Sequence, residues 1–483
     1  MIGTLEPGDW GLSVAADGAL QVGECRARDL ARTYGTPLHV IHEPRLEETG
    51  TRFRRAFEKA YPGRTSIHFA FKCNSVPAVL RAVRRAGLKA EVMSEFELDL
   101  ALQLGHGGSD IIVNGPAKTP AFLRRCVGLG ADARGPLVVV DSADELEALG
   151  RIAADERRPA AVLLRINPDY VPSGMNAGTA TGSRTGCAFG FDLKTGEADR
   201  ALDRIRSLKQ IDFAGFHFHI GTGIRTPRSY SRVLERLAPL VRRARGLGLK
   251  VRAMDVGGGF ASMTTREMTT AELLAYQGWG RLPAGIAGGG EASFEEFARE
   301  ISRAMMRLFP AGDLPELVAE PGRSIASPNQ FLLLTVNAVK TRPRAGTWIV
   351  TDGGLGTVCL PLFYEMHEVF LADDVRRPRT MKATIIGPVC FATDFVYRNK
   401  LLPAVHPGEI LAVMDSGAYF TAQEHSFGFY RPAVAAVNGR ARLVRRRESF
   451  TDAIGRDDPD EIDVRPAPVR PGASPIIQQG ERP

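Results

Sequence analysis

A lysine stands at the end of the apolar run Ile67–Phe71, just before a helix start at Pro77. A lysine that is desolvated at the mouth of a buried strand can act as a Schiff-base nucleophile, because burial favours its neutral amine. A strand-end lysine with its charge in solvent would give the same local pattern. The segment therefore makes Lys72 a candidate reactive residue. Other parts of the sequence are needed to choose between a buried reactive lysine and a solvent-exposed one.

Three more groups of polar residues or glycines follow apolar runs. His217 and His219 stand two residues apart and share one face of a strand, where they could bind a metal, stack on a flat group or pack. The run Gly257–Gly259 would let backbone amides approach an anion closely, although it would also suit a plain tight turn. The run Glu320–Arg323 supplies a carboxylate, a turn and a guanidinium, which could serve a functional site. A surface ion pair that stabilises a turn would give the same pattern.

Elements of regular structure must bring these groups together. The sequence contains eight strand-like runs, and helical stretches separate most of them. This alternation predicts parallel β/α units, and eight such units are enough to close a (β/α)8 barrel. An open doubly wound sheet is the alternative. Barrel enzymes place their chemistry at the carboxyl ends of the strands. Three of the four groups directly follow predicted strands, and the two histidines lie near the end of another. The predicted strands are 67–71, 90–93, 111–113, 137–140, 161–166, 213–220, 251–256 and 317–319.

The pattern changes to strands and turns after about residue 330, with few helices between them. This change predicts a separate β domain. We expect an N-terminal segment, 1–43, that joins the β domain, a barrel over 44–326, the C-terminal β domain over 327–456, and a flexible tail over 457–483.

The composition narrows the class of protein. A chain of 483 residues with 44% hydrophobic and 24% charged residues can form two or three globular domains. Its net charge of +7 comes from interspersed acids and bases, which argues against nucleic-acid binding. The six cysteines include no CxxC pair, so neither a metal site nor a disulfide framework is indicated. We expect a cytoplasmic protein with reduced thiols, because no secretory leader or membrane-length apolar run is evident.

The motifs, taken in order, carry a resemblance to a known family. From about residue 36 to residue 452 the chain resembles the fold-type III pyridoxal-phosphate decarboxylases, which include the ornithine, diaminopimelate and biosynthetic arginine decarboxylases. The resemblance implies an alanine-racemase-like (β/α)8 barrel with a C-terminal β-sandwich or β-barrel domain, and pyridoxal 5'-phosphate as cofactor. The matching runs are 69–74, 218–223, 255–260, 320–323, 387–394 and 415–419.

The resemblance also implies roles for single residues. Lys72 would form the internal aldimine, His219 would stack on the pyridine ring, and Glu320 would keep its nitrogen protonated. Cys390 would come from the partner subunit of a homodimer with shared active sites and reprotonate the quinonoid carbon after decarboxylation of the external aldimine. The phosphate would be held by Gly257, Gly258, Gly259 and Gly322, with Arg323, Thr222 and Tyr419 as further contacts.

Departures from the family pattern bear on the substrate. Diaminopimelate decarboxylases have an arginine where this chain has Leu360, and they share with ornithine decarboxylases an acid where it has Phe391. Each of these two replacements removes a charged group that would bind the far end of a diamino acid. Another departure is Glu91, where relatives usually show aspartate. We expect the substrate to be contacted by Arg323, Leu360, Tyr364, Phe391, Asp394 and Tyr419.

The long segment 261–292 suggests room for a larger substrate. The leading hypothesis is decarboxylation of an amino-acid conjugate, either tethered to a carrier protein or part of a siderophore intermediate. The alternatives are a decarboxylase of diaminopimelate or another basic amino acid, an amino-acid racemase on the same cofactor, and a non-catalytic pyridoxal-phosphate carrier. No metal is expected.

Overall fold

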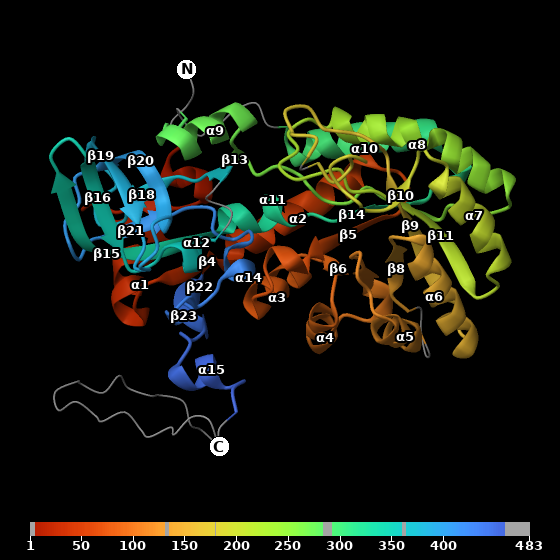
Figure 1. Cartoon of the computed structure of the whole chain (residues 1–483), viewed down its shortest axis with the longest axis horizontal. Helices are drawn as coiled ribbons and strands as arrows, with labels where there is room; N and C mark the ends of the chain where they lie inside the picture. Colours follow the sequence, from red (N-terminus) through yellow and green to blue (C-terminus); the bar gives the residue numbers. More distant parts are fainter. Residues whose placement is uncertain (1–4, 131–134, 179, 284–291, 360–363, 459–483) are drawn as a thin grey trace.

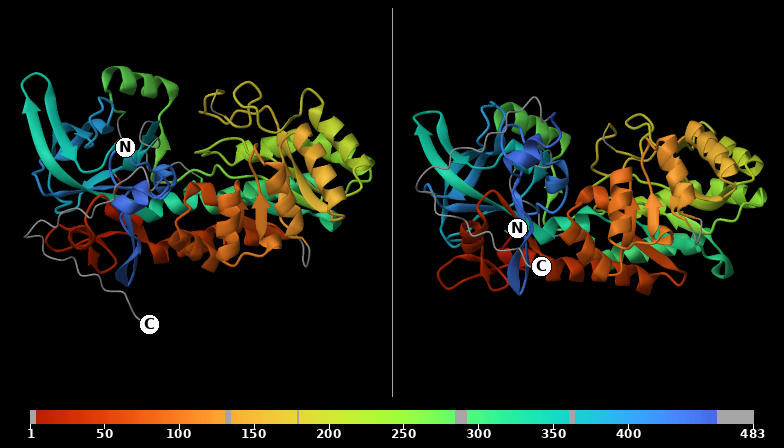
Figure 2. Two further views of the ribbon diagram at one scale, coloured as in Figure 1. Left: turned by 60° about the horizontal axis from the view of Figure 1, so that its bottom comes forward. Right: turned by 90° about the horizontal axis from the view of Figure 1, so that it is seen from below.

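The computed structural model describes residues 5–458 except 131–134, 179, 284–291 and 360–363. The chain forms two units, a barrel ringed by helices on the right of Figure 1 and a β-rich domain on the left. Figure 2 shows the same two units from two other directions. Most of the predicted tail, part of the long segment 261–292 and Leu360 lie outside the described residues.

Eight parallel strands close the barrel. Each strand pairs with its neighbours in a ring, and the pairing of β14 with β5 and of β8 with β9 leaves no free edge. A short strand, β10 (Phe191–Asp192), extends β9 at one end. In ring order the strands are β5 (Thr65–Ala70), β6 (Lys89–Val92), β7 (Ile111–Val113), β8 (Leu137–Val140), β9 (Ala160–Asn167), β11 (Ile211–His217), β12 (Ala253–Asp255) and β14 (Glu316–Ala319).

Helices cover the outside of the barrel and begin at clear capping signals. The hydroxyls of Ser94, Thr119, Ser142 and Ser293 each accept a hydrogen bond from the backbone amide three residues later, which satisfies a free amide of the first turn. The barrel helices are α2 (Glu43–Ala60), α3 (Pro77–Arg85), α4 (Glu95–Gln103), α5 (Pro120–Gly128), α6 (Ala143–Asp155), α7 (Glu197–Ser207), α8 (Arg228–Gly246) and α10 (Phe294–Leu308).

Strand β15 (Gln330–Arg342) is the centre of the β domain. Its first half pairs with β4 (Leu38–His42) and β21 (Ile410–Val413), and its second half pairs with β16 (Gly346–Thr351). The N-terminal segment therefore contributes β4 to this sheet. The domain also contains β18 (Val369–Leu371), β19 (Arg379–Ile386), β20 (Phe395–Pro403), β22 (Ala433–Asn438) and β23 (Arg440–Arg445).

Short elements complete the chain. They are η1 (Pro7–Trp10), β1 (Ser13–Val14), β2 (Leu20–Val22), β3 (Cys25–Arg26), α1 (Ala27–Tyr34), η2 (Phe71–Cys73), η3 (Gly108–Asp110), η4 (Ala311–Asp313), α11 (Arg323–Ala326), η5 (Ser327–Asn329), α12 (Leu355–Val358), α14 (Phe420–Gln423) and α15 (Phe450–Ile454).

The segment after the glycine triplet joins the two domains. Its strand β13 (Arg266–Glu267) pairs antiparallel with β17 (Glu365–Met366) of the β domain. Its helix α9 (Thr270–Trp279) docks there too, since the Tyr276 hydroxyl accepts from the amide of Arg398 at 3.0 Å. The described part of the segment thus has a structural role, which weakens the case for a substrate-admitting loop.

The predicted fold is confirmed, because a closed eight-stranded parallel barrel is followed by a β-rich domain. Every predicted barrel strand matches an observed strand, but several helices were missed, including α2, whose buried face presents Leu46, Phe53 and Phe57. Within the described chain, we find no helix that combines the length and apolarity needed to cross a membrane.

Candidate active site

A layer of polar side chains lies above the apolar floor of the barrel. The floor consists of Ile112, Val139, Leu163, Ala214, Ala253 and Val318. Because side chains alternate along a strand, the residue two positions further on points to the same interior. On five strands that residue is polar and buried, and the five are Asn114, Asp141, Arg165, Asp255 and Glu320.

Lys72 reaches this layer from the turn after β5. Its ammonium donates to both oxygens of Glu91, at 2.8 and 2.7 Å, and the Glu91 side chain is fully buried. Burial alone would lower the pKa of Lys72, but the carboxylates of Glu91 and Glu320 outweigh it and raise the pKa above its usual value. In the ligand-free chain these carboxylates thus favour the charged amine and offset the effect of burial. Glu91 must take up or relay a proton before the amine can react.

Glu320 is held as an ionised carboxylate at the centre of the layer. Asn114 donates to one of its oxygens at 2.7 Å, and the Nε2 atom of His217 lies 3.3 Å from the other. Burial would raise the pKa of Glu320, yet His217, Lys72 and His219 together lower it. Burial and the nearby Glu320 raise the pKa of Asp255 far above its usual value. Glu320 can therefore accept a further hydrogen bond from a protonated ring nitrogen.

His217, Asp255 and Glu320 place possible ligand atoms within 4.8 Å of one another. The raised pKa of Asp255 favours its neutral form, which is a poor ligand for a cation. Of the two histidines singled out in the sequence, His217 thus serves the carboxylate. His219 lies two residues further along the chain, close to the glycine triplet Gly257–Gly259.

The glycine triplet packs against the strand ends too closely for a side chain. A Cβ atom on Gly258 would lie 2.3 Å from the carbonyl oxygen of Glu320, and Gly259 has φ +92°. The amide of Gly258 donates to Nδ1 of His219 at 3.1 Å. Burial, with Lys72 and Arg165, lowers the pKa of His219 to about 3, so its ring stays neutral.

We expect Gly258→Ala to weaken pyridoxal-phosphate affinity by about tenfold or more, because the added methyl group must push Glu320 or His219 out of place. Fluorescence titration of the apo-protein with cofactor measures the change. Gly246→Ala is the matched control, since nothing lies within 4 Å of a Cβ at that helical position. Equal affinity in both variants would contradict the assignment of the triplet to the site.

Arg323 marks the other side of the site. Its Nε donates to the Thr222 hydroxyl at 3.2 Å, and its guanidinium lies 4.8 Å from the centre of the Tyr419 ring. It also forms an ion pair with Glu365 at 2.5 Å, and both side chains are buried. The amide of Tyr419 donates to the carbonyl of Cys73 at 2.8 Å, which ties this tyrosine to the Lys72 turn.

The residues predicted to meet the substrate fall into two groups. Tyr364 lies near Arg323, which acts on its hydroxyl electrostatically. Cys390 and Phe391 are exposed, and within the described chain no hydrogen bond, ion pair or ring contact links them to the Lys72 cluster. The carboxylate of Asp394 accepts backbone amides of Leu355 and Val389 at 2.6 and 2.8 Å, so it supports the loop that carries Cys390.

Several buried residues of the site were given no role in the sequence analysis, among them Asn114, Asp255 and Glu365. Asn114 and Asp255 each lie two residues after a floor residue, so counting along the strands would have found them. Glu365 has no such signal, because its place beside Arg323 depends on how β17 packs against the barrel.

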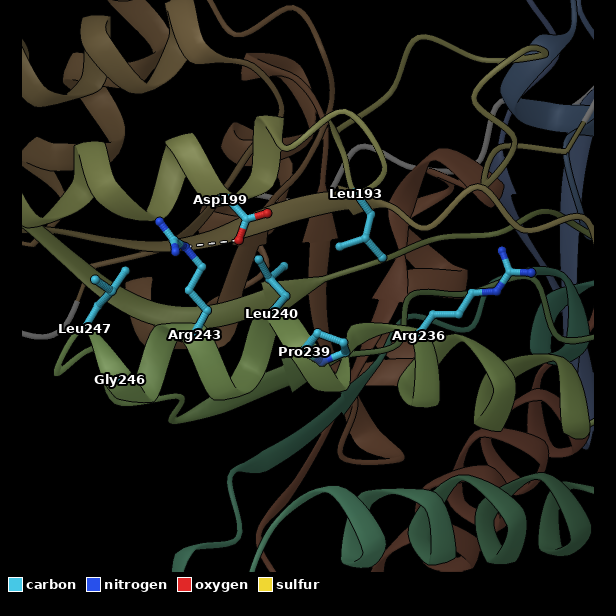
Figure 3. A pocket seen from close by; sticks show the side chains of 8 residues that line it. All are labelled: Leu193, Asp199, Arg236, Pro239, Leu240, Arg243, Gly246 and Leu247. Atoms are coloured by element: carbon cyan, nitrogen blue, oxygen red, sulfur yellow. Dashed lines mark ion pairs between the residues drawn. The ribbon is translucent and has the colours of Figure 1, made fainter.

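A separate pocket of about 590 Å³ lies against helix α8 (Figure 3). Arg243 pairs there with Asp199 of α7 at 3.1 Å, and Leu240 and Leu193 supply apolar lining. It contains none of the strand-end residues described above, so we do not assign it to the active site.

Comparison with known proteins places the chain in a family. The model of the family described as "Pyridoxal-dependent decarboxylase, pyridoxal binding domain" matches residues 47–327. The chain is 31% identical to a diaminopimelate decarboxylase of Actinosynnema pretiosum, covering 94% of this chain and 96% of the relative. It is 30% identical to the corresponding protein of Corynebacterium efficiens, covering 91% of each.

A solved diaminopimelate decarboxylase of M. jannaschii, in complex with L-lysine, superposes with a TM-score of 0.81 at 24% identity, covering 92% of this chain and 97% of that one. This likeness supports the fold. Together with the family match and the relatives above, it shows that the chain belongs to the pyridoxal-dependent decarboxylases, which use pyridoxal 5'-phosphate to remove a carboxyl group from an amino acid.

Proposed function

We propose that this decarboxylase acts on a free basic or diamino acid, with diaminopimelate as the first candidate. The observation that carries the proposal is the alignment, over nearly the full length of both chains, with relatives named diaminopimelate decarboxylase. The expectation of a carrier-tethered or siderophore-type substrate is not supported, because the relatives reported above are named diaminopimelate decarboxylase and the described part of the segment that motivated it packs on the β domain.

One buried and one half-buried acid answer part of the objection to a basic substrate. Phe391 replaces an acid of the relatives, but Glu365 and Glu267 lie beside Arg323 and act on it electrostatically. Burial raises the pKa of Glu267 to about 7. These carboxyl groups offer partners for a cationic substrate end that sequence analysis alone did not provide.

The site residues fit pyridoxal phosphate chemically. The set combines a primary amine, an ionised carboxylate, a neutral imidazole and glycine turns that a Cβ would obstruct. When bound, pyridoxal phosphate supplies an aldehyde that condenses with amines and a ring that accepts the electron pair left by departing carbon dioxide. We assign Lys72 to the aldehyde, Glu320 to the ring nitrogen and His219 to the ring face. Phosphate contacts are assigned to Gly257–Gly259, Gly322, Arg323, Thr222 and Tyr419.

The residues of this chain then have definite tasks. Glu91 holds the Lys72 ammonium and accepts its proton before the amine reacts. Glu320 keeps a proton at the ring nitrogen, because its own low pKa makes it a carboxylate at neutral pH. Cys390 of the partner subunit returns a proton to the substrate carbon. The neutral ring of His219 can stack without adding charge.

The position of Cys390 supports the proposal of shared sites in a homodimer. The thiol lies outside the Lys72 cluster of its own chain, so a second chain would have to bring one to it. An exposed aromatic segment lies against the same loop, since the ring of Phe391 lies 5.9 Å from that of Phe427, and Phe429 and Tyr430 follow Phe427 in the chain. Such a patch on a surface favours an interface. Its members are Phe391, Phe427, Phe429 and Tyr430, each about half exposed.

The substrate proposal predicts carbon dioxide release from the cofactor-loaded protein with meso-diaminopimelate, lysine, ornithine or arginine, tested in parallel with citrate-conjugated and carrier-tethered amino acids. We expect turnover of at least one free basic amino acid, with diaminopimelate first. Turnover confined to the conjugates would overturn the proposal. It would support instead the interpretation that Leu360 and Phe391 leave a charged substrate end without partners.

A further inference from the structure

Asn114 occupies a central place among the charged groups of the site. It directly follows β7, and its backbone amide donates to the carbonyl of Val92 at 2.8 Å, which fixes it against the end of β6. Its side chain is buried and points into the barrel, two residues beyond the floor residue Ile112.

The Asn114 amide binds one carboxylate of the cofactor site and acts on a second. Its Nδ2 donates to Glu320 at 2.7 Å. Burial raises the pKa of Glu91 overall, and Lys72 and Asn114 are among the groups that act against this rise. One amide nitrogen has two hydrogens, so it can serve both acids at once. The Oδ1 atom of Asn114 is buried without a hydrogen-bond partner. The reversed orientation would turn this oxygen toward two carboxylates, so the donor must face them.

We propose that Asn114 is a positioning residue that holds Glu320 and Glu91, the partners of the ring nitrogen and of the amine, in place and favours the ionised form of each. The inference rests on the proposed roles of Lys72 and Glu320. Two buried carboxylates that approach one another repel, and a shared neutral donor stabilises both without adding a countercharge. A lysine or arginine at this position would instead compete with the Lys72 ammonium for Glu91.

The charged groups around Asn114 determine which substitution tests the proposal. Asp at position 114 has the same shape but loses the donor when it ionises and regains an O–H donor when it is protonated. The groups that face this position from the packed elements are Lys72 after β5, Glu91 on β6, Glu97 on α4, His217 on β11, Asp255 on β12 and Glu320 after β14. Because four of these six are acids, a third ionised carboxylate here should be strongly unfavourable.

The experiment measures pyridoxal-phosphate affinity of apo-protein by fluorescence at pH 6 and pH 8. We expect Asn114→Asp to bind within about threefold of the wild type at pH 6 and at least about tenfold more weakly at pH 8. Asn114→Leu, which has no donor at either pH, should be weak at both. Asn167→Asp is the control, since Asn167 is buried at the end of β9 but donates to the carbonyl of Phe189.

Thermal melting of each apo-protein separates binding from folding. An Asn114→Asp affinity that follows the wild type at both pH values would overturn the inference. A loss of affinity in Asn114→Leu that tracks its melting temperature, with Asn167→Asp behaving alike, would overturn it too. If wild-type protein itself fails to bind pyridoxal phosphate at Lys72, the proposed roles of Lys72 and Glu320 fail instead, so the two failures are distinguishable.

Discussion

Replacing Lys72 with alanine is expected to lower the decarboxylation rate by about a thousandfold or more, because the variant loses the amine that is placed to meet the cofactor aldehyde. The geometry is specific, since the Nζ atom lies between the carboxylates that set its protonation. Borohydride reduction followed by peptide mass spectrometry should find cofactor mass on the Lys72 peptide of the wild type and none in the variant.

The matched control is a second buried lysine of the same barrel. Lys118 pairs with Glu145 at 2.9 Å and its side chain is fully buried, but it lies outside the cofactor cluster. Lys118→Met should therefore keep the covalent label on Lys72. A Lys72→Ala protein that still carries reducible cofactor within this barrel, or a label that disappears with Lys118→Met alone, would contradict the assignment of Lys72.

The barrel was predictable because its strands leave a strong local signal. A parallel strand covered by helices is apolar on both faces, so runs such as Val138–Val140 and Ile111–Val113 stand out in the sequence. The rule that barrel chemistry collects at the carboxyl ends of strands then led to Lys72 and Glu320 without reference to any contact. Helix α2 gave a weaker signal, because charged residues interrupt its apolar face.

The protonation of the site residues and the packing of the two domains could not be predicted from the sequence in the same way. The charge of Lys72 depends on Glu91 and Glu320, which lie on two other strands, and local sequence does not show that they converge. The segment after Gly259 looked like a substrate loop, but it pairs through β13 with a strand about a hundred residues later. Such contacts between distant segments determine the electrostatics of the site, so they become visible only in the folded chain.

The two halves of the proposed active site can be separated by mixing inactive variants. Cys390→Ala should lower the decarboxylation rate by about a hundredfold, the usual contribution of one proton-transferring group. Lys72→Ala inactivates through the barrel of the same chain. If each site combines Lys72 of one subunit with Cys390 of the partner subunit, a mixed dimer has one site with both defects and one with neither.

Random exchange of subunits makes half of the dimers mixed, so the mixture should recover about a quarter of wild-type activity. The matched control mixes Lys72→Ala with Glu320→Gln. Both residues lie in one barrel cluster, so every site in that mixture keeps at least one defect and activity should stay low. Recovery in both mixtures would point to an effect of assembly alone. No recovery in the first, when subunit exchange is verified by native mass spectrometry, would mean that Cys390 acts within its own chain or not at all.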